Sequence, residues 1–583
     1  MNSFSVTGKK WLIKKYNSSE HSFIKDNFYL DDITSKLLAI KGIEKNKIKD
    51  FLNPTIKNNL PNPNTLKDMD KATKRTVDAI LNKEKIGIFG DYDVDGATST
   101  ALLGKFFEEL KIEFFTYIPD RKLEGYGPSK KGFENLLKNK IDLIYTVDCG
   151  TLSFEPIEFA YNEKIDVIVL DHHQSEIKLP KAHSVVNPNR LDDNSNLNYL
   201  CAAGVCFIFL ISVNRELRLK NWFKNNNISE PDLMGYLDLV SLGTICDVVP
   251  LINLNRAIVK QGLKILNLKK NLGLKTLFDI CKIESKVTPY HLGYVIGPRI
   301  NAGGRVGKCS HGANLLLNDN ARETFKMASE LNIFNTERQL MEKDLLNVVS
   351  SKINNLNDPV IILSGKNWHE GIIGIIASRI KDKYNKPTFI ISINGEIGKA
   401  SVRSVHGYDV GAIIIGAVQK GIIKKGGGHK MAGGFTIDVN KINEFKIYAI
   451  NKFKNLNLNV EEEKKIYIDS EISASALNYE FYNKINKLAP FGSGNSEPTF
   501  VIEDLRLLNS KIIADKHIKS TLLSLDGSAI KTIAFNVLHT DLSAYLLKNS
   551  KTFNIVGKLS LNEWRGQKNV EFIINDISVN KND

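Results

Sequence analysis

The sequence predicts an α/β multidomain protein with a parallel-sheet domain, a smaller α/β domain joined to it by a long helix, and a C-terminal β-barrel. Between residues 85 and 190, short apolar runs alternate with helix-like segments, which is typical of a mostly parallel sheet covered on both faces. A similar alternation begins at residue 359. From about residue 462, closely spaced runs of alternating apolar and polar residues indicate a small β-barrel or sandwich.

Length, charge and cysteine content narrow the classes of protein to consider. The 583 residues leave room for three or four domains of about 150 residues each. The net charge of +14 favours a polyanionic partner such as nucleic acid, although a chain rich in Lys, Asn and Ile can reach that charge through compositional bias alone. We expect a cytoplasmic protein with free thiols, because the sequence has no long apolar stretch, no secretory signal and no CxxC pair among its six cysteines.

The expected elements change in kind along the chain. Residues 1–80 are interpreted as a helical and irregular lead-in, and residues 199–265 as mainly helical. Between them, apolar runs predict buried strands, and a helix follows the first strand. The expected strands are KIGIFG, FFTYIP, DLIYTVD, DVIVLD and HSVVNP, and the expected helix is ATSTALLGKFFEEL.

Residues 319–352 carry apolar side chains at intervals of three and four, which predicts a long helix. It is interpreted either as a helix that connects two domains or as an ordinary packed helix. Its apolar stripe contains Phe325, Ala328, Leu331, Leu340 and Leu345. The expected boundaries are 1–80 for the lead-in, 81–318 for the parallel-sheet domain, 319–352 for the helix, 353–460 for the smaller α/β domain and 461–583 for the β-rich domain.

Acidic residues follow three of the expected strands. They are Asp91, Asp93 and Asp95 after the first strand, Asp148 after the third, and Asp171 with His172 and His173 after the fourth. Asp247 ends an apolar helical segment and is a further candidate. The carboxyl ends of parallel strands meet at one edge of a sheet, so these side chains are expected to gather in one crevice.

A cluster of so many like charges costs free energy unless a cation offsets it. Carboxylate oxygens and imidazole nitrogens suit Mn²⁺ or Mg²⁺. Two such ions, about 3.5–4 Å apart and bridged by one carboxylate, can lower the pKa of a shared water and clamp a phosphate. The alternatives for the single motifs are a calcium loop for Asp91 to Asp95, a helix N-cap for Asp148 and a surface loop for His172 and His173. The sequence therefore favours a two-metal phosphodiesterase site.

The motifs DYDVDG, VDCG, DHH and GTICDVVP resemble, in order and spacing, the four motifs of the DHH phosphoesterase superfamily. GGGHKMAGGF resembles the signature of the associated DHHA1 domain. RINAGGR at 299–305, SVRS at 401–404, DMDKATKR and LAPFGSGNSEP narrow the resemblance to the RecJ family of bacterial exonucleases. The resemblance covers nearly the whole chain.

This resemblance implies a metal-dependent exonuclease that degrades single-stranded DNA in the 5′→3′ direction to 5′-mononucleotides, in DNA repair and recombination. It implies two divalent ions, Mn²⁺ or Mg²⁺. The implied ligands are Asp91, Asp93 and Asp148 for one ion, and Asp95, Asp148, His172 and Asp247 for the other, with Asp148 bridging. His173 is expected to face the scissile phosphate, and Asp171 to orient a neighbouring histidine.

The same resemblance implies a pocket for the 5′ end of the DNA. The matching positions are Arg121, Tyr126, Arg305, Ser401 and Arg403, and Gly428 and His429 in the glycine run are added as phosphate donors. The alternative interpretation of each arginine, taken singly, is a solvated surface residue. The alternative interpretation of the glycine run is a plain flexible turn. The β-rich region would be an OB-fold that binds single strands, with Trp564 and Phe553 as candidates for base stacking and core packing as the alternative for Phe553.

The expected partners are single-stranded DNA, a helicase and a single-strand-binding protein, and the chain is expected to be a monomer without membrane contact. Two other functions are considered. One is a phosphoesterase of the same superfamily that acts on smaller substrates such as pyrophosphate or cyclic dinucleotides, against which the β-rich domain argues. The other is a non-catalytic DNA-binding scaffold, which would be expected to have lost some of the acids and histidines that this sequence retains.

Overall fold

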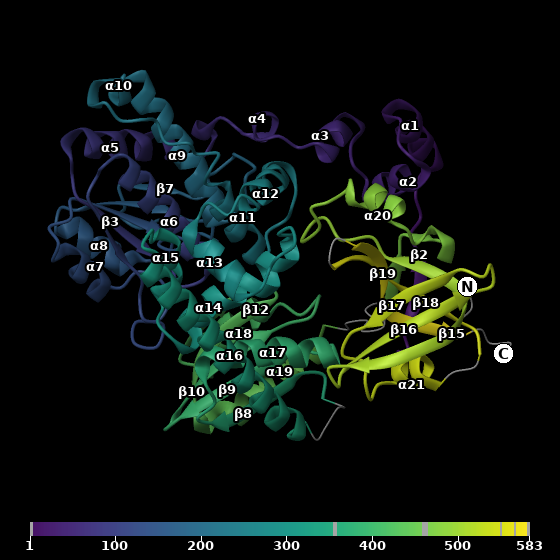
Figure 1. Cartoon of the computed structure of the whole chain (residues 1–583). Helices are drawn as coiled ribbons and strands as arrows, with labels where there is room; N and C mark the ends of the chain where they lie inside the picture. Colours follow the sequence, from purple (N-terminus) through teal and green to yellow (C-terminus); the bar gives the residue numbers. More distant parts are fainter. Residues whose placement is uncertain (1–3, 354–357, 457–464, 549–550, 565–566, 580–583) are drawn as a thin grey trace. The chain divides into compact units, whose positions relative to one another are not determined.

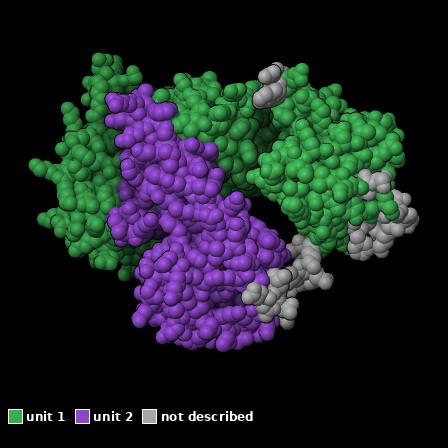
Figure 2. Space-filling view, turned by 60° about the horizontal axis from the view of Figure 1, so that its bottom comes forward, with its two compact units in different colours: residues 1–117, 127–295, 464–583 green, residues 118–126, 296–463 purple. Residues whose placement is uncertain are grey.

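The structure, a computed structural model, describes the chain apart from residues 1–3, 354–357, 457–464, 549–550, 565–566 and 580–583. The chain divides into two compact units (Figure 2). Unit 1 contains residues 1–117, 127–295 and 464–583, and unit 2 contains residues 118–126 and 296–463. Each unit is therefore built from segments that are far apart in the sequence.

A five-stranded parallel sheet forms the centre of the first part of unit 1. Its strands are β3 (Ile86–Gly90), β4 (Phe114–Tyr117), β5 (Leu143–Val147), β6 (Asp166–Leu170) and β7 (Ser184–Val186). They lie in the order β4-β3-β5-β6-β7. From β3 the chain runs to β4 on one side and then to β5 on the other, so a topological switch point lies between β3 and β5. The predicted parallel sheet is confirmed.

Helices cover both faces of this sheet, as its apolar strands require (Figure 1). On one face, α7 and α8 pack on Phe89 and Ile144. On the other face, Tyr145 contacts Phe107 of α6 and Phe209 of α9, and its hydroxyl lies 2.7 Å from the Thr76 hydroxyl of α5. The helices of this part are α5 (Met69–Asn82), α6 (Val94–Glu109), α7 (Lys130–Leu137), α8 (Phe154–Asn162), α9 (Ala202–Leu219), α10 (Trp222–Asn226), α11 (Leu237–Cys246), α12 (Asn253–Leu266), α13 (Leu272–Ile280) and the π-helix His291–Ile296.

The C-terminal part of unit 1 is a closed five-stranded barrel. Its strands are β15 (Phe500–Ile513), β16 (His517–Ser524), β17 (Ala529–Ala534), β18 (Phe553–Trp564) and β19 (Gln567–Val579). The pairing runs β15-β16-β17-β19-β18 and returns to β15, with one parallel pair, β17 and β19. Short elements accompany it: β13 (Lys465–Ile468), β14 (Ser470–Glu471), α20 (Tyr479–Asn486) and α21 (Asp541–Lys548). The predicted OB-like barrel is confirmed.

Phe553 is fully buried in the barrel core, so it packs and does not stack on bases. The side chain of Trp564 lies outside the described residues.

The N-terminal segment differs from the helical and irregular lead-in that the sequence predicts. It has the expected helices α1 (Ser18–Phe28), α2 (Asp32–Lys41), α3 (Ile48–Leu52) and α4 (Ile56–Asn59), but also two strands, β1 (Phe4–Ser5) and β2 (Lys10–Ile13). β1 pairs with β19, and β2 pairs in parallel with β13. The strands were missed because they are short and their partners lie near the other end of the chain.

Unit 2 contains a second, mixed sheet in the order β11-β12-β10-β9-β8, with β8 and β9 parallel. The strands are β8 (Ile361–Lys366), β9 (Thr388–Asn394), β10 (Ile397–Arg403), β11 (Lys425–Gly428) and β12 (Ala432–Asp438). The helices are α14 (Gly297–Val306), α15 (His311–Leu317), α16 (Ala321–Ser351), α17 (Glu370–Tyr384), α18 (Val410–Gln419) and α19 (Ile442–Lys454).

The long helix α16 lies within the predicted 319–352 and has 31 residues, Ala321–Ser351. Ala328 and Leu331 of the predicted apolar stripe are fully buried, and Leu345 packs at the edge of a core cluster. Phe325 and Leu340 of the same stripe are instead 61% and 58% exposed, so only part of the stripe is packed. A stripe of apolar residues places side chains on one face of a helix, but it does not show how much of that face is covered.

All six cysteines are free thiols, as predicted, and three of them are buried. Among the described helices, none combines the length and the apolar character needed to cross a bilayer.

Candidate functional site

The acids that follow β3 lie at the switch point of the parallel sheet. Asp93 caps α6, since its Oδ1 accepts a 3.1 Å hydrogen bond from the Gly96 N–H, and Asp95 lies in the first turn of that helix. A Cβ on Gly96 would lie 2.5 Å from the carbonyl oxygen of Asp91. Only glycine therefore lets the helix start this close to the strand end, which brings Asp91, Asp93 and Asp95 together.

Asp148 joins the first two of these acids. Oxygen atoms of Asp91, Asp93 and Asp148 lie within 4.8 Å of one another. Asp148 follows β5 with a positive φ of 60°, a conformation that costs free energy in a residue with a side chain. It does not cap a helix, because α8 begins after Ser153. The alternative interpretation of Asp148 as an N-cap is therefore wrong.

His172 lies among a second set of carboxylates. Its Nε2 is 3.3 Å from Asp148 Oδ1, 3.6 Å from Asp247 Oδ2 and 3.7 Å from Asp95 Oδ2. This nitrogen is buried and makes no hydrogen bond to the described residues. Asp148 thus borders both sets of donor atoms, in the way that a ligand shared by two ions requires.

Helix ends position the other two carboxylates of this second set. The N–H groups of Ala202 and Ala203, at the start of α9, donate to Asp95 at 2.6 and 2.9 Å. Asp247 follows the last residue of α11. A Cβ on Gly243 of α11 would lie 2.8 Å from Asp95 Oδ1, so this glycine lets α11 approach Asp95. The role of α9 was missed in the sequence, where the small residues at 202–204 were the available signal.

The loop after β6 is organised by Asp171. Its Oδ1 accepts hydrogen bonds from the N–H groups of His172 and His173 at 2.7 and 3.2 Å, and lies 2.8 Å from His173 Nδ1. Asn187 donates to the His173 carbonyl at 2.8 Å, and Asn189 donates to the His172 carbonyl. The two asparagines were not identified from the sequence, although polar residues directly after the β7 strand were a signal for them.

Burial and mutual repulsion change the protonation of the cluster. Burial, followed by the charges of Asp93, Asp95, Asp91 and Asp247, raises the pKa of Asp148 well above its ordinary value. Burial likewise raises the pKa of Asp95, and it raises that of Asp247 to about 8. Burial opposes the protonation of His173, but the hydrogen bond and charge of Asp171 outweigh it and raise the pKa of His173 to about 9.

This donor set fits two divalent cations. The carboxylate oxygens are hard ligands, the His172 nitrogen is buried among three of them without a hydrogen bond, and the cluster carries more negative charge than its histidines offset. The structure thus brings together all the residues that the sequence placed at a metal site.

Unit 2 gathers three of the predicted phosphate-binding residues around the first turns of α17. Arg305 Nη1 donates to the carbonyl of Gly371 at 3.2 Å. A Cβ on Gly374 would lie 2.9 Å from Ser401 Oγ and 3.6 Å from Arg403 Nη2. Burial, followed by the charge of Arg121, lowers the pKa of Arg403. Arg121, Arg305, Ser401 and Arg403, which we call the arginine cluster, therefore form a cationic group with a hydroxyl.

The remaining predicted residues of this group lie elsewhere in unit 2 or are more exposed. Tyr126 is 54% exposed and lies in the same segment as Arg121. Gly428 ends β11, and His429 follows it, both exposed. The His429 N–H donates to the Ala432 carbonyl at 2.7 Å, and its carbonyl accepts from Gly411 at 3.2 Å. No described contact joins these last two residues to the arginine cluster.

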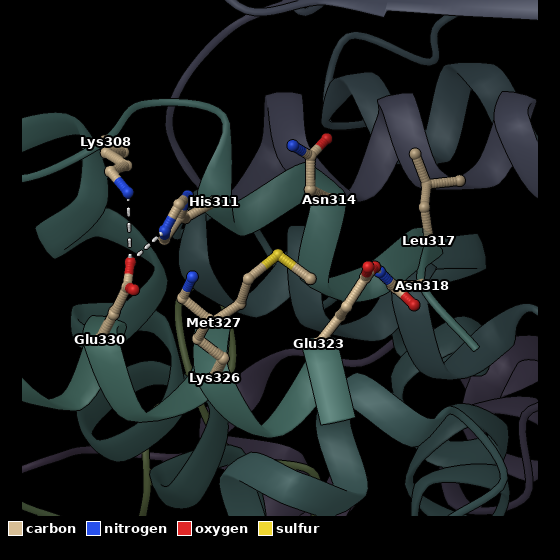
Figure 3. Close-up of a pocket in the computed structure, with 9 residues that line it drawn as sticks. All are labelled: Lys308, His311, Asn314, Leu317, Asn318, Glu323, Lys326, Met327 and Glu330. Atoms are coloured by element: carbon tan, nitrogen blue, oxygen red, sulfur yellow. Dashed lines mark hydrogen bonds and ion pairs between the residues drawn. The ribbon is translucent and has the colours of Figure 1, made fainter. Parts of the chain in front are cut away.

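A separate cavity of about 440 Å³ lies between α15 and α16 (Figure 3). It is lined by Lys308, His311, Asn314, Leu317, Asn318, Glu323, Lys326, Met327 and Glu330. Glu330 lies 2.6 Å from His311 and 3.5 Å from Lys308. These two side chains of the cavity lining therefore already have a partner within the protein. No residue predicted for a functional site lines this cavity.

Three family models match the chain. They are the DHH family N-terminal domain over residues 85–244, the DHHA1 domain over residues 357–455 and the RecJ OB domain over residues 468–576.

Proteins named single-stranded-DNA-specific exonuclease RecJ are similar over most of the chain. The protein from Escherichia coli K12 is 31% identical, over 94% of this chain and 96% of its own length. The protein from Haemophilus influenzae is 32% identical, over 90% of this chain and 93% of its own length. The crystal structure of RecJ in complex with Mn²⁺ from Thermus thermophilus has a TM-score of 0.80 and 24% identity, and covers 98% of this chain and 80% of that one. That likeness shows a shared fold.

We expect Mn²⁺ to raise the Tm of the protein, and to raise it more at pH 8 than at pH 6. The carboxyls of Asp95, Asp148 and Asp247 have a higher pKa in the folded chain than the ordinary 3.8. Above pH 3.8 these three carboxyls therefore bind more protons in the folded state than in the unfolded state, and their contribution to the free energy of unfolding falls as the pH rises. An ion replaces those protons and binds more tightly once they have dissociated. Thermal melts with and without Mn²⁺ at both pH values measure this, and a shift that does not depend on pH would contradict it.

Proposed function

The chain belongs to the RecJ family, and we propose that it is a metal-dependent exonuclease that degrades single-stranded DNA in the 5′→3′ direction. Its products would be 5′-mononucleotides, and its role would lie in DNA repair and recombination. The observation that carries this proposal is the position of Asp148 between two sets of donor atoms at the switch point of the sheet. The relatives support it, since they carry the name single-stranded-DNA-specific exonuclease.

The proposed ligands follow the two sets of donor atoms. Asp91, Asp93 and Asp148 would hold one Mn²⁺ or Mg²⁺ ion, and Asp95, Asp148, His172 and Asp247 would hold the second. Such ions, when bound, supply a water of lowered pKa and stabilise charge on a phosphate. The T. thermophilus structure with Mn²⁺ supports this choice of metal.

His173 is the residue proposed to face the scissile phosphate. Asp171 fixes its Nδ1, and the raised pKa of His173 keeps the ring protonated near pH 7. A protonated imidazole can donate a hydrogen bond to a phosphate oxygen and stabilise the charge that develops there. Asp171 is buried and orients this ring and the loop backbone, and its Oδ2 also accepts a 3.1 Å hydrogen bond from the Thr151 N–H in the loop after β5.

The arginine cluster is proposed to bind the 5′ end. The guanidinium groups of Arg121, Arg305 and Arg403 can donate paired hydrogen bonds to phosphate oxygens, and Ser401 can add a hydroxyl donor. Tyr126 is exposed enough to stack on a base, and Gly428 and His429 can offer further donors. A site that holds the terminal phosphate would make hydrolysis start at that end and give the 5′→3′ direction.

The barrel and the net charge of +14 are proposed to hold the rest of the strand, through contacts that weaken as salt is added. A helicase would supply single strands, and a single-strand-binding protein would deliver them. We place the protein in the cytoplasm as a monomer, in line with its free thiols.

The function is tested with end-labelled single strands that carry a block at one end. We expect mononucleotides from a 3′-blocked strand in the presence of Mn²⁺, and none from a 5′-blocked strand or with EDTA. A duplex of the same sequence and a dinucleotide serve as comparison substrates. Faster turnover of the dinucleotide than of the long strand would favour a phosphoesterase for small substrates instead.

We predict that Asp148→Ala lowers the rate of hydrolysis by about 10³-fold or more, while the affinity for DNA stays within a few-fold of wild type. The substitution removes the carboxylate shared by both sets of donors but no phosphate donor. Rates are measured by product release and affinity by fluorescence anisotropy in Ca²⁺ or EDTA. Asp279→Asn, an exposed position in the same unit, is the control. Substantial turnover by the Asp148 variant would refute the ligand assignment.

Arg403→Met is predicted to raise KM for a 5′-phosphorylated strand by about 10- to 100-fold, and to affect a 5′-hydroxyl strand much less, because one charged phosphate donor is lost. Arg379→Met is the matched control, since Arg379 is exposed on α17 and pairs with Glu342 at 2.9 Å. Steady-state kinetics on both strands give the comparison. An equal effect on the two substrates would show that Arg403 does not contact the terminal phosphate.

A further inference from the structure

A short loop in the C-terminal part of unit 1, residues 488–495, packs against the chain directly after Asp247. The Leu251 N–H donates to the carbonyl of Ser493 at 2.8 Å. A Cβ on Gly494 would lie 3.0 Å from Pro250 Cβ, and a Cβ on Gly492 would lie 2.8 Å from Leu251 Cδ1. The loop and residues 250–251 are therefore in close contact through both backbone and side chains.

The loop has a defined shape of its own. Gly492 and Asn495 exchange backbone hydrogen bonds of 3.0 and 3.2 Å, which closes a tight turn. Asn495 is buried, and its Nδ2 donates to the carbonyls of Leu488 and Pro490 at 2.9 and 2.7 Å. Buried hydrogen bonds of this kind fix one conformation, so the loop can act as a rigid support.

Arg256 of α12 attaches this loop to the parallel-sheet part of unit 1. Its guanidinium is buried and donates to the carbonyls of Leu488, Ala489 and Pro490 at 2.8–3.2 Å, and to the carbonyl of Phe51 at 2.8 Å. Burial lowers the pKa of Arg256 to about 10. A buried cation whose bonds go to backbone carbonyls costs free energy unless those partners are held in place.

The connection between α11 and α12 carries the proposed metal ligand Asp247. Val248, the next residue, has a positive φ of 60°, which is strained for a β-branched residue. Further along, Asn255 Nδ2 donates to the Pro250 carbonyl at 3.0 Å and to the Tyr199 carbonyl at 2.6 Å. The connection is thus strained at Val248 and held at 250–251, and the loop supplies the contact at Leu251.

We propose that residues 488–495 position Asp247 for metal binding. The segment that leads into the barrel would then support the metal centre through its contacts with residues 250–251. This inference rests on the proposed metal-dependent function. It applies to the donor set of Asp95, His172 and Asp247. The other set, Asp91, Asp93 and Asp148, is carried by the ends of β3 and β5 and depends on none of these contacts.

A matched pair of glycine substitutions tests the proposal. Gly494 and Gly527 have positive φ values of 70° and 83°, so alanine strains the backbone at either position. At Gly494 the new methyl group would press on Pro250, whereas at Gly527 it would meet nothing within 4 Å. The two variants therefore share the backbone strain and differ in the contact with the Asp247 connection.

Mn²⁺ binding to the full chain is measured by titration calorimetry and by the EPR signal of free Mn²⁺, with Tm as a measure of folding. For Gly494→Ala we expect one ion to bind as in the wild type and the second to bind about tenfold more weakly, as for other residues that orient a ligand. Gly527→Ala is expected to bind both ions normally. Arg256→Gln is a second variant, and its weakened second ion should be accompanied by a lower Tm.

Several results would overturn the proposal. They are wild-type affinity for both ions in Gly494→Ala, equal weakening of both ions in that variant, or a wild-type protein that binds no pair of Mn²⁺ ions. A wild-type protein that binds two ions but does not degrade single-stranded DNA would refute the proposed function, and the Mn²⁺ comparison would then decide the positioning role by itself.

Discussion

The repulsion among carboxylates at the end of the parallel sheet is the constraint on which the rest of unit 1 depends. Asp148 is almost fully buried beside Asp91, Asp93, Asp95 and Asp247, and its raised pKa reflects the free energy that this costs. The surroundings keep the group together despite this cost. The start of α9 binds Asp95, glycines let the backbone of α6 and α11 approach closely, and β5 ends in a left-handed residue. Bound cations, or protons in their place, relieve this repulsion.

Unit 2 contains the opposite case. Burial, followed by the charge of Arg121, lowers the pKa of Arg403, so like charges repel one another in the arginine cluster as they do among the acids. Each unit thus holds charges of one sign that a ligand of the other sign would stabilise. Divalent cations suit the acids, and a terminal phosphate suits the arginines.

The sequence predicted the parallel sheet, the long helix and the barrel because each depends on local periodicity or on strands next to one another in the chain. It also placed Asp91, Asp148 and His172 together, because strand ends in a parallel sheet converge whatever lies between them. Asp247 ends a helix, and its role beside them came from the resemblance to the DHH motifs. The sequence did not show β1 and β2, whose partners are distant, or the exposure of Phe325. It also missed Asn187 and the N–H groups of Ala202 and Ala203, because the polar residues after β7 and the small residues at 202–204 do not show which groups they will contact in the folded chain.

The pairing of β1 and β2 with β19 and β13 has a consequence for how the protein is made. Residues 4–13 are translated before the parallel-sheet part, yet they pair with residues 465–468 and 578–579, which are translated after it. Trp11, which is 5% exposed in the finished structure, must stay uncovered while the intervening chain is translated. Such long-range pairing is slow, and an exposed apolar segment invites aggregation or binding by chaperones. The parallel-sheet part can fold during translation. In contrast, β1 and β2 have no partners until β19 and β13 have been translated.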